Sequence, residues 1–503
     1  MDSRLSAGTI ALVGLATVLS AAAFYLAIGL SPPWWAPWVA AVPVLWVSTR
    51  LRWWAAGLVV LLAHGAGGLS LWNYLRELIK FPLWLSLGAL LLPALAFSAA
   101  VLLFRLIAKR GQPWCALLAF PSVIVAYEYL SSLLLGTFGN TAYTQMDNPF
   151  VLQIGSLAGL WGIGLIVMLF APTLTLIAIT HGKTRARLLV TLVVVFGGVY
   201  GYGAWRIWGA PAATFFLPVG LAESNVPENI FPQTDADAMR LMRAYAEEAR
   251  LLARQGAKVV VLPEMTALVR ESISGEVDSL FQRTAREADA QIVLGVLHAT
   301  PKGAFNEARL YLHSSPTPAV YRKHHLVPGL EAGTTPGHDI FVSSQPSGRI
   351  GLEICRDMDY AEPANRYGQE KVGLVLVPAW DQGVDAWWHG RMALMRAVEQ
   401  GFSLVRVAKN GLLTVSDGRG RVLAETTTTP ARAFTTLLAI VPVRHEPTLY
   451  QRWGDWFAWL DLAGIFVLLL YLSRSGGRFT TEDDCLIRSR SVETLLHTGP
   501  PST

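Results

Sequence analysis

Charged residues are scarce in this chain, and their scarcity excludes an ordinary soluble protein. Asp, Glu, Lys and Arg make up 15% of the 503 residues, and hydrophobic residues make up 52%. Soluble domains carry about 25% charged residues. The composition therefore predicts a membrane protein. The net charge of +5 does not require nucleic acid as a partner, because basic residues in short loops between apolar runs orient helices in a bilayer.

Cysteine is scarce as well, with Cys115, Cys355 and Cys485 as the complete set. Three widely spaced cysteines exclude a disulfide framework and do not have the spacing of a zinc site. We therefore expect no zinc site, and we expect no other metal and no organic cofactor. A signal-peptide cleavage site is also lacking after the first apolar run, so we interpret this run as a retained anchor.

Long apolar runs are abundant, and most approach the ~20 residues that a spanning helix needs. Seven precede the middle of the chain and an eighth follows it, at residues 9–30, 34–48, 53–75, 82–106, 115–135, 157–180, 188–208 and 456–472. We predict four parts: a seven-helix membrane domain (1–210), a soluble catalytic domain (211–445), an eighth spanning helix (446–473) and a disordered cytoplasmic tail (474–503) that contains Cys485.

Basic residues sit in alternate loops between these runs. They cluster at Arg50 and Arg52, at Lys109 and Arg110, and at 183–187, whereas loops 31–33 and 136–149 carry no Lys or Arg. Because positive loops remain in the cytoplasm, both ends are expected inside and the soluble domain outside.

The soluble part alternates apolar strand-like runs with amphipathic helical ones. Residues 258–262, 291–298 and 403–408 are strand-like, and 235–254 and 385–400 have helical spacing. This alternation, with additional hairpins, favours an α/β sandwich whose helices lie outside a β core.

Three residues that carry chemistry stand just beyond apolar strands. Glu264 follows Val-Val-Val-Leu-Pro, Lys323 follows Val-Tyr-Arg, and Cys355 ends a strand in which Ile350, Leu352 and Ile354 alternate. A carboxylate can take the thiol proton before the thiolate attacks a carbonyl. A lysine can stabilise the thiolate and the oxyanion, together with backbone N–H groups that follow the cysteine.

Each of these residues alone has a simpler interpretation. A lone cysteine at a strand end is often a small buried hydrophobe, and Glu264 with Lys323 could form a plain salt bridge. The three together, with the right residue types, favour catalysis.

Around these residues the sequence resembles the nitrilase, or carbon–nitrogen hydrolase, superfamily with its Glu-Lys-Cys triad. It is most similar to the membrane-embedded branch, the apolipoprotein N-acyltransferases. Four stretches carry this resemblance: Val-Leu-Pro-Glu at 261–264, Tyr-Arg-Lys-His-His-Leu-Val-Pro-Gly-Leu-Glu at 321–331, the helix at 389–399, and Phe-Gly-Asn-Thr-Ala-Tyr-Thr-Gln at 138–145. It implies a nitrilase-like αββα domain, with Glu264, Lys323 and Cys355 as catalytic residues and Glu331 as a second glutamate that orients the lysine or the base.

The chain departs from the family in the residues next to its cysteine. The family usually has Tyr-Glu there, and this chain has Arg356 and Asp357, which we expect to support the site. Arg356 would place a cation beside the thiolate, where it lowers the thiol pKa or repels an incoming ammonium. Asp357 retains an acid. The departures leave the acyl acceptor open.

Aromatic residues are the weaker candidates for substrate contacts. Phe231 stands where the family has a lipid-contacting Trp, Trp380 follows the next predicted strand, and Trp387 with its neighbour Trp388 could dip toward lipid. His324, His325 and His389 are interpreted as structural or surface residues rather than metal ligands.

The resemblance implies an acyltransferase of the bacterial inner membrane, with its catalytic domain on the periplasmic side. An acyl chain would pass from a membrane phospholipid through a Cys355 thioester to the α-amine of a diacylglyceryl-cysteine lipoprotein, without nucleic acid. Two alternatives stay open: a membrane-tethered nitrilase-type amidase or acyltransferase with another acceptor, which shares the triad, and a transporter or receptor. Few ionisable groups lie mid-membrane, Glu128 being the main exception, which argues against transport.

Overall fold

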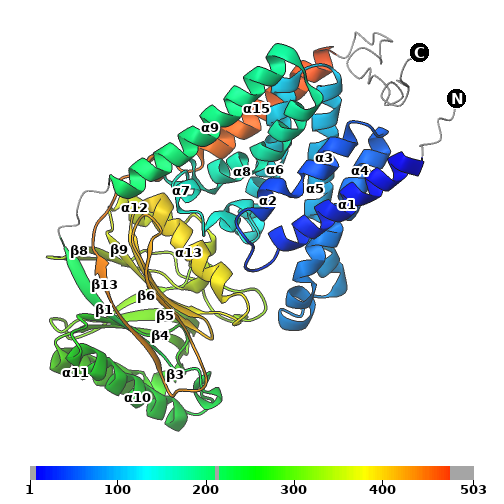
Figure 1. Ribbon diagram of the computed structural model, residues 1–503. Helices are drawn as coiled ribbons and strands as arrows, with labels where there is room; N and C mark the ends of the chain where they lie inside the picture. The colour runs from blue at the N-terminus through cyan, green and yellow to red at the C-terminus, as the bar shows by residue number, and fades with distance from the viewer. Residues whose placement is uncertain (1–6, 210–214, 476–503) are drawn as a thin grey trace, which may run out of the picture.

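The computed structural model describes residues 7–209 and 215–475 and has two parts (Figure 1). Membrane-type helices form one part and a two-sheet α/β domain forms the other. The expected tail beyond residue 475, including Cys485, lies outside the described residues.

In the described ranges, seven helices are long and apolar enough to cross a membrane. Six precede the α/β domain and one follows it: α1 (Ala7–Ala27), α4 (Trp53–Gly68) with η1 (Leu69–Leu71), α5 (Leu83–Lys109), α6 (Pro113–Leu135), α8 (Gly155–Ile179), α9 (Gly182–Trp208) and α15 (Trp456–Ser475). Their outward faces expose leucine and valine, such as Leu134 and Val193, as expected where lipid rather than water surrounds a helix.

The second predicted apolar run forms two short helices rather than one continuous helix. They are α2 (Ala36–Ala40) and α3 (Val42–Ser48), each with a proline in its first turn. Because proline lacks an N–H and is favoured only where a helix starts, Pro37 lies in the first turn of α2, and Pro43 starts α3 as a separate helix. At about 1.5 Å per residue the pair is much shorter than its neighbours.

Shorter helices lie between the long ones and turn toward the α/β domain. They are η2 (Tyr74–Leu78), η3 (Thr141–Gln145) and α7 (Pro149–Leu152). Asn140 and Asn148 cap η3 and α7 by accepting backbone N–H bonds, as polar residues at helix starts commonly do.

The α/β domain contains two six-strand paths. One sheet has the order β13-β1-β2-β4-β5-β6, with β3 paired to β4, and the other has the order β12-β11-β10-β9-β8-β7. The strands of the first are β1 (Phe216–Glu223), β2 (Val259–Val261), β3 (Leu268–Arg270), β4 (Gln291–Thr300), β5 (Gly303–Tyr311), β6 (Ala319–Arg322) and β13 (Thr435–Pro442). The strands of the second are β7 (Val342–Gln345), β8 (Gly348–Leu352), β9 (Leu374–Trp380), β10 (Ser403–Lys409), β11 (Leu412–Ser416) and β12 (Val422–Thr427).

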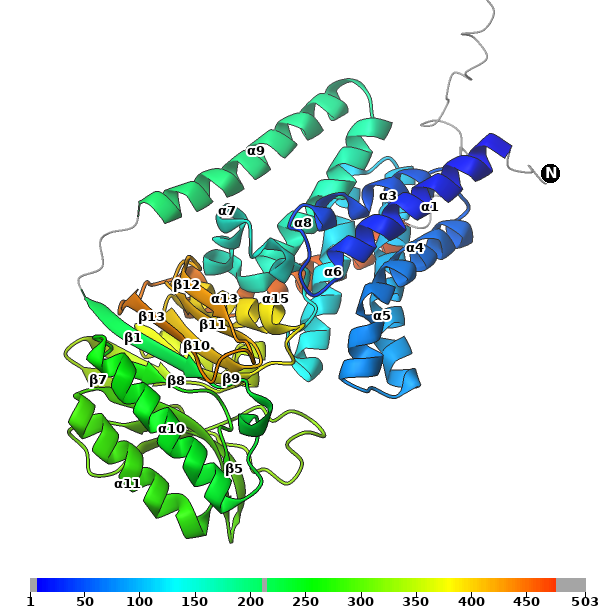
Figure 2. The same ribbon diagram turned by 60° about the horizontal axis from the view of Figure 1, so that its bottom comes forward.

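Helices cover the outer face of each sheet, as Figures 1 and 2 show. The first sheet carries α10 (Asp235–Arg254) and α11 (Glu271–Ala288), and the second carries α12 (Ala364–Gln369) and α13 (Ala386–Gln400). Alternate strand residues such as Val261, Leu352 and Val407 form the core between the sheets. This arrangement confirms the expected αββα sandwich joined to a multi-span helical domain.

Helix α13 packs between the second sheet and the membrane helices. Its residues Met392 and Met395 share one buried cluster with Tyr143 and Trp161 of the helical part. After β13, a short helix α14 (Leu449–Trp453) leads into α15, which packs along α6 and α8. The α/β domain is therefore held against the membrane part through a hydrophobic interface.

Candidate active site

Glu264, Lys323 and Cys355 come from both sheets. Glu264 lies three residues beyond β2, Lys323 directly follows β6, and Cys355 begins the short helix η5 (Cys355–Asp359) three residues after β8. The sandwich brings these strand ends together. Strands β2 and β8 each pair in parallel with a neighbour in their own sheet, and functional groups commonly lie beyond the carboxyl ends of such strands.

Lys323 joins two glutamates. Its Nζ lies 2.8 Å from Oε1 of Glu264 and 2.8 Å from Oε2 of Glu331. All three side chains are buried, with 1% of the Lys323 side chain and at most 4% of either carboxylate exposed. Glu331 also accepts the amide of Val327 at 2.7 Å, which fixes its loop. Glu331 thus contacts the lysine directly.

The pKa values of this cluster follow from burial and mutual charge. Burial raises the pKa of Glu264, Lys323 opposes this change, and Glu331 adds to it. Burial alone would lower the pKa of Lys323, but Glu264, Cys355 and Glu331 outweigh it and raise that pKa. Lys323 therefore remains an ammonium, while Glu264 has the raised pKa that suits a general base.

Asn306 completes this cluster, and no motif in the sequence singled it out. Its Nδ2 donates to Oε1 of Glu264 and to Oε1 of Glu331, each at 2.7 Å. The register of the β5–β6 hairpin, in which Glu307 faces Arg322, sets Asn306 beside Lys323. The proximity of Asn306 to Lys323 cannot be predicted until the register of the hairpin is known.

Cys355 has a left-handed backbone conformation, with φ of 43°. Such a value is uncommon for a residue with a side chain and is found at functional sites. Its Sγ lies 3.6 Å from the carbonyl oxygen of Trp380. Burial raises the pKa of the thiol well above its ordinary value, Glu264 adds to this, and Lys323 and Arg406 oppose it. The resting group is therefore a thiol that needs a base.

Asp357 connects the segment that begins at Cys355 to the residues on either side of Lys323. One oxygen accepts the Tyr321 hydroxyl at 2.7 Å, and the other accepts the amides of His324 and His325 at 3.0 and 2.8 Å. The Asp357 amide itself donates to Ile354 at 2.9 Å, so the Arg356 amide is the candidate oxyanion donor. Asp357 thus positions the loops on either side of the site.

A buried ion pair that the sequence did not predict lies near Cys355. Arg406 on β10 donates to both oxygens of Asp381, at 2.9 and 2.6 Å. Both side chains are at most 1% exposed. Gly411 makes room for the pair, since a Cβ there would clash with Asp381. The pairing of β9 with β10 creates this contact between segments that are apart in sequence.

Lys409 was missed as well. Its Nζ donates to the carbonyl oxygens of Met265, at 2.8 Å, and Ile230, so it ties together the loops that carry Glu264 and Phe231. Burial lowers the pKa of Lys409 to about 7, with Glu223 and Glu264 opposing the change.

The structure brings together two of the three aromatic candidates. The rings of Phe231 and Trp380 lie 6.2 Å apart, and the Lys409 ammonium lies 4.7 Å from the Trp380 ring centre. Trp387 is instead on α13, where its ring contacts Trp388 and Arg391. Phe231 and Trp380 therefore form an aromatic pair next to Cys355.

His389 lies where the α/β domain meets the membrane part, with its ring centre 5.7 Å from that of Phe138. Its Nδ1 lies 3.7 Å from Asp359 and its Nε2 lies 3.6 Å from Asp385. Asp385 also accepts the hydroxyl of Tyr74, on η2, at 3.0 Å. Burial lowers the pKa of His389, but the two aspartates outweigh this effect and raise it to about 10.

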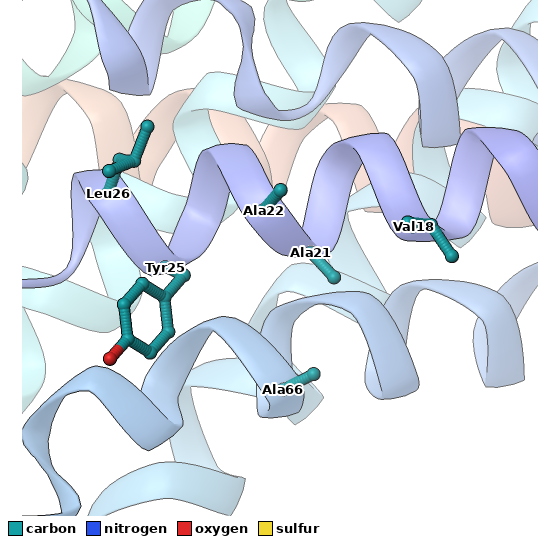
Figure 3. Close-up of a pocket in the computed structure, with 6 residues that line it drawn as sticks. All are labelled: Val18, Ala21, Ala22, Tyr25, Leu26 and Ala66. Atoms are coloured by element: carbon teal, nitrogen blue, oxygen red, sulfur yellow. The ribbon is translucent and has the colours of Figure 1, made fainter.

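An apolar groove of about 550 Å³ lies elsewhere, between α1 and α4 (Figure 3). Val18, Ala21, Ala22, Tyr25, Leu26 and Ala66 line it. None of these residues belongs to the elements that carry the triad.

Comparison with known proteins gives matches to both parts of the chain. Residues 14–173 match the apolipoprotein N-acyltransferase N-terminal domain, and residues 229–438 match the carbon-nitrogen hydrolase family. A curated apolipoprotein N-acyltransferase of Geobacter metallireducens is 27% identical over 440 residues, covering 77% of this chain and 81% of the relative. Another, from Gloeobacter violaceus, is 27% identical over 528 residues, covering 94% of this chain and 95% of the relative.

Among solved structures, an amidase from a Nesterenkonia species is similar to part of the chain. It is 21% identical, with a TM-score of 0.38, and the match covers 47% of this chain and 93% of the amidase.

Proposed function

We propose that this chain, which carries both the apolipoprotein N-acyltransferase N-terminal domain and a carbon-nitrogen hydrolase domain, transfers a fatty acyl chain through a thioester on Cys355. The donor is a membrane phospholipid, and the acceptor is the N-terminal α-amine of a diacylglyceryl-cysteine lipoprotein. One observation carries this proposal: Glu264, Lys323 and Cys355 gather in a domain whose helix α13 shares a buried cluster with the membrane helices.

The first half of the reaction forms the thioester. Glu264 takes the proton of the Cys355 thiol, and the sulfur attacks the ester carbonyl of the phospholipid. Lys323 and the Arg356 amide donate to the oxyanion of the tetrahedral intermediate. When the intermediate collapses, the C–O bond breaks. The lysophospholipid leaves with the proton that Glu264 held.

The second half forms an amide. The neutral α-amine of the acceptor attacks the thioester carbonyl, and Glu264 takes a proton from the attacking nitrogen. The C–S bond breaks, and the sulfur regains a proton from Glu264. Donor and acceptor thus react in turn at the same cysteine, which is ping-pong covalent catalysis.

The membrane part gives a physical reason for lipid substrates. Exposing an acyl chain to water costs about 0.8 kcal/mol per CH₂ group, so the chain must remain in an apolar environment while its ester meets Cys355. The proposed arrangement is a membrane domain at 1–210, a periplasmic catalytic domain at 211–445 and a last spanning helix at 446–473, in the bacterial inner membrane. The basic loops at alternate helix ends support this orientation.

An amidase for small amides is the competing function because it would use the same three residues. The match of residues 14–173 to an acyltransferase domain favours transfer, since a single anchor would suffice for an amidase.

Intact-protein mass spectrometry tests the proposal. Detergent-purified protein is incubated with phospholipid and then with a diacylated lipopeptide. An acyl-sized mass gain that is absent in Cys355→Ala and is discharged by the lipopeptide is the expected result. Discharge by water alone would indicate a lipid hydrolase, and absence of any adduct would refute a phospholipid donor.

A further inference from the structure

The cations around Cys355 differ in how their charge is balanced. Lys323 pairs with two glutamates, and Arg406 pairs with both oxygens of Asp381. Lys409 donates to backbone carbonyl groups. Arg356, the residue after the nucleophile, forms no ion pair with any of the described residues.

The guanidinium group of Arg356 is half-buried and incompletely bonded. Its Nη2 donates to the hydroxyl of Tyr360 at 3.0 Å, and its Cζ lies 5.7 Å from the Tyr360 ring centre. Its Nε is buried and has no hydrogen-bond partner within the described ranges. A buried charged donor without a partner is unfavourable. A bound anion would accept a hydrogen bond from this Nε and remove the cost.

The position of Arg356 indicates where such an anion would come from. The Tyr360 ring lies close to Gly136, at the end of the membrane helix α6, where an added Cβ would be 3.2 Å from the ring. Beside it, the amide and hydroxyl of Thr137 donate to the carbonyl of Asp359, at 2.9 and 2.7 Å. The nucleophile helix η5 therefore lies against the membrane part, where a lipid would reach Cys355.

We propose that Arg356 binds the phosphate of a glycerophospholipid acyl donor while the ester of that donor lies at Cys355. In such a lipid, the glycerol carbons hold the phosphate within a few bonds of the ester carbonyl. A guanidinium fork matches the oxygens of a phosphate group. This inference rests on the proposed function and specifies its donor, because a donor without a phosphate would leave Arg356 unpaired.

An alternative role for Arg356 is to stabilise the Cys355 thiolate. Lys323 and Arg406 are the main cations that oppose the raised pKa of the thiol. Burial lowers the pKa of Arg356, but its hydrogen bond to Tyr360 and the charges of Asp359 and Cys355 outweigh burial and raise that pKa, so Arg356 also interacts with the thiolate. The two roles make different predictions: stabilising the thiolate would affect every donor, whereas binding phosphate affects phosphate-bearing donors alone.

The test compares two donors in the full-length protein in detergent micelles. Dipalmitoyl phosphatidylglycerol carries a phosphate, and p-nitrophenyl palmitate delivers the same acyl group without one. Acylation of Cys355 is followed by intact mass for wild type, Arg356→Met and Arg356→Lys. Arg366→Met is the matched control, because Arg366 lies on the neighbouring helix α12 and its half-buried side chain pairs with Glu362.

We expect Arg356→Met to lower kcat/KM for the phospholipid by about 10- to 100-fold, mainly through KM, as for the loss of a charged hydrogen-bonded contact. Arg356→Lys should retain part of the rate, and Arg366→Met should match wild type. Acylation by p-nitrophenyl palmitate should change by a much smaller factor, which also shows that the variant is folded.

Equal losses with both donors would overturn the proposal in favour of a role at the thiol. Unchanged phospholipid kinetics in Arg356→Met would overturn it as well. Failure of the proposed function is distinguishable, since wild type itself would then form no adduct with phospholipid.

Discussion

Asn306 donates a hydrogen bond of 2.7 Å to Oε1 of Glu264, the same oxygen that accepts from Lys323 at 2.8 Å. The proposed base therefore has one oxygen held by two donors. Because Asn306 also bonds Glu331, a single amide sets the spacing of both carboxylates around the lysine.

Replacement of Asn306 by alanine should slow thioester formation by about 10- to 100-fold, since two charge-assisted hydrogen bonds are lost. The rate of Cys355 acylation measures the effect. Asn365→Ala is the control, because Asn365 bonds Gln400 on α13 rather than the triad. An Asn306→Ala rate equal to that of the control would show that Lys323 alone sets the geometry.

The Asp381–Arg406 pair gives a prediction about stability. Asp381→Asn leaves the Arg406 charge buried without its carboxylate, and breaking a buried pair in this way costs about 3–5 kcal/mol. We therefore expect a clear decrease in the thermal unfolding temperature in detergent. The matched control is Asp289→Asn, which breaks an exposed pair with Lys258 and should have little effect. Similar unfolding temperatures for the two variants would contradict the prediction.

The sequence predicted the fold, and it singled out Glu264, Lys323 and Cys355 as residues that could come together, because both inferences depend on local patterns. Apolar runs of spanning length, alternating strands and a functional residue at each strand end can all be read along the chain. The short second run was the exception, since Pro43 divides it into two helices.

The remaining site residues depend on pairing between distant strands. Asn306 reaches Glu264 through the β5–β6 hairpin, and Arg406 reaches Asp381 through the β9–β10 pair. Lys409 acts through backbone carbonyl groups, which leave no trace in the sequence. These contacts depend on which strands pair and in which register, and neither can be read from local patterns along the chain.

His389 predicts a dependence of stability on pH. Its pKa is raised to about 10, above the ordinary value of about 6.5. The native state therefore binds more protons than the unfolded state between these values. The stabilisation is complete below pH 6.5 and is lost as the pH rises toward 10.

The expected result is a wild-type unfolding temperature that falls more steeply than that of His389→Gln between pH 6.5 and 10. His313, an exposed histidine in the loop after β5, provides the control variant His313→Gln, which should retain the wild-type slope. Parallel curves for wild type and His389→Gln would show that the two aspartates do not hold a charged imidazole.

The last prediction concerns the interface between the membrane and catalytic parts. Gly159 interrupts α8 with φ of +64°, a conformation that glycine adopts freely and other residues do not. This turn lets the amide of Leu160 donate to Oε1 of Glu399, on α13, at 3.0 Å. A Cβ on Gly159 would lie 2.8 Å from Cδ2 of Tyr450 and 3.1 Å from the same Glu399 oxygen. Gly159→Ala must therefore displace both neighbours.

We expect Gly159→Ala to destabilise the protein by about 1–3 kcal/mol, the usual cost of a strained backbone conformation, and to slow acylation from phospholipid because α13 shifts relative to the membrane helices. Gly164→Ala on the same helix is the matched control, since its Cβ would lie at ordinary contact distances of 3.5 and 3.7 Å. Thermal unfolding and Cys355 acylation are measured on both variants. If Gly159→Ala were less stable but acylated at the wild-type rate, the contact would serve folding alone. A loss of both stability and acylation rate would indicate that the contact between α8 and α13 also positions the lipid ester at Cys355.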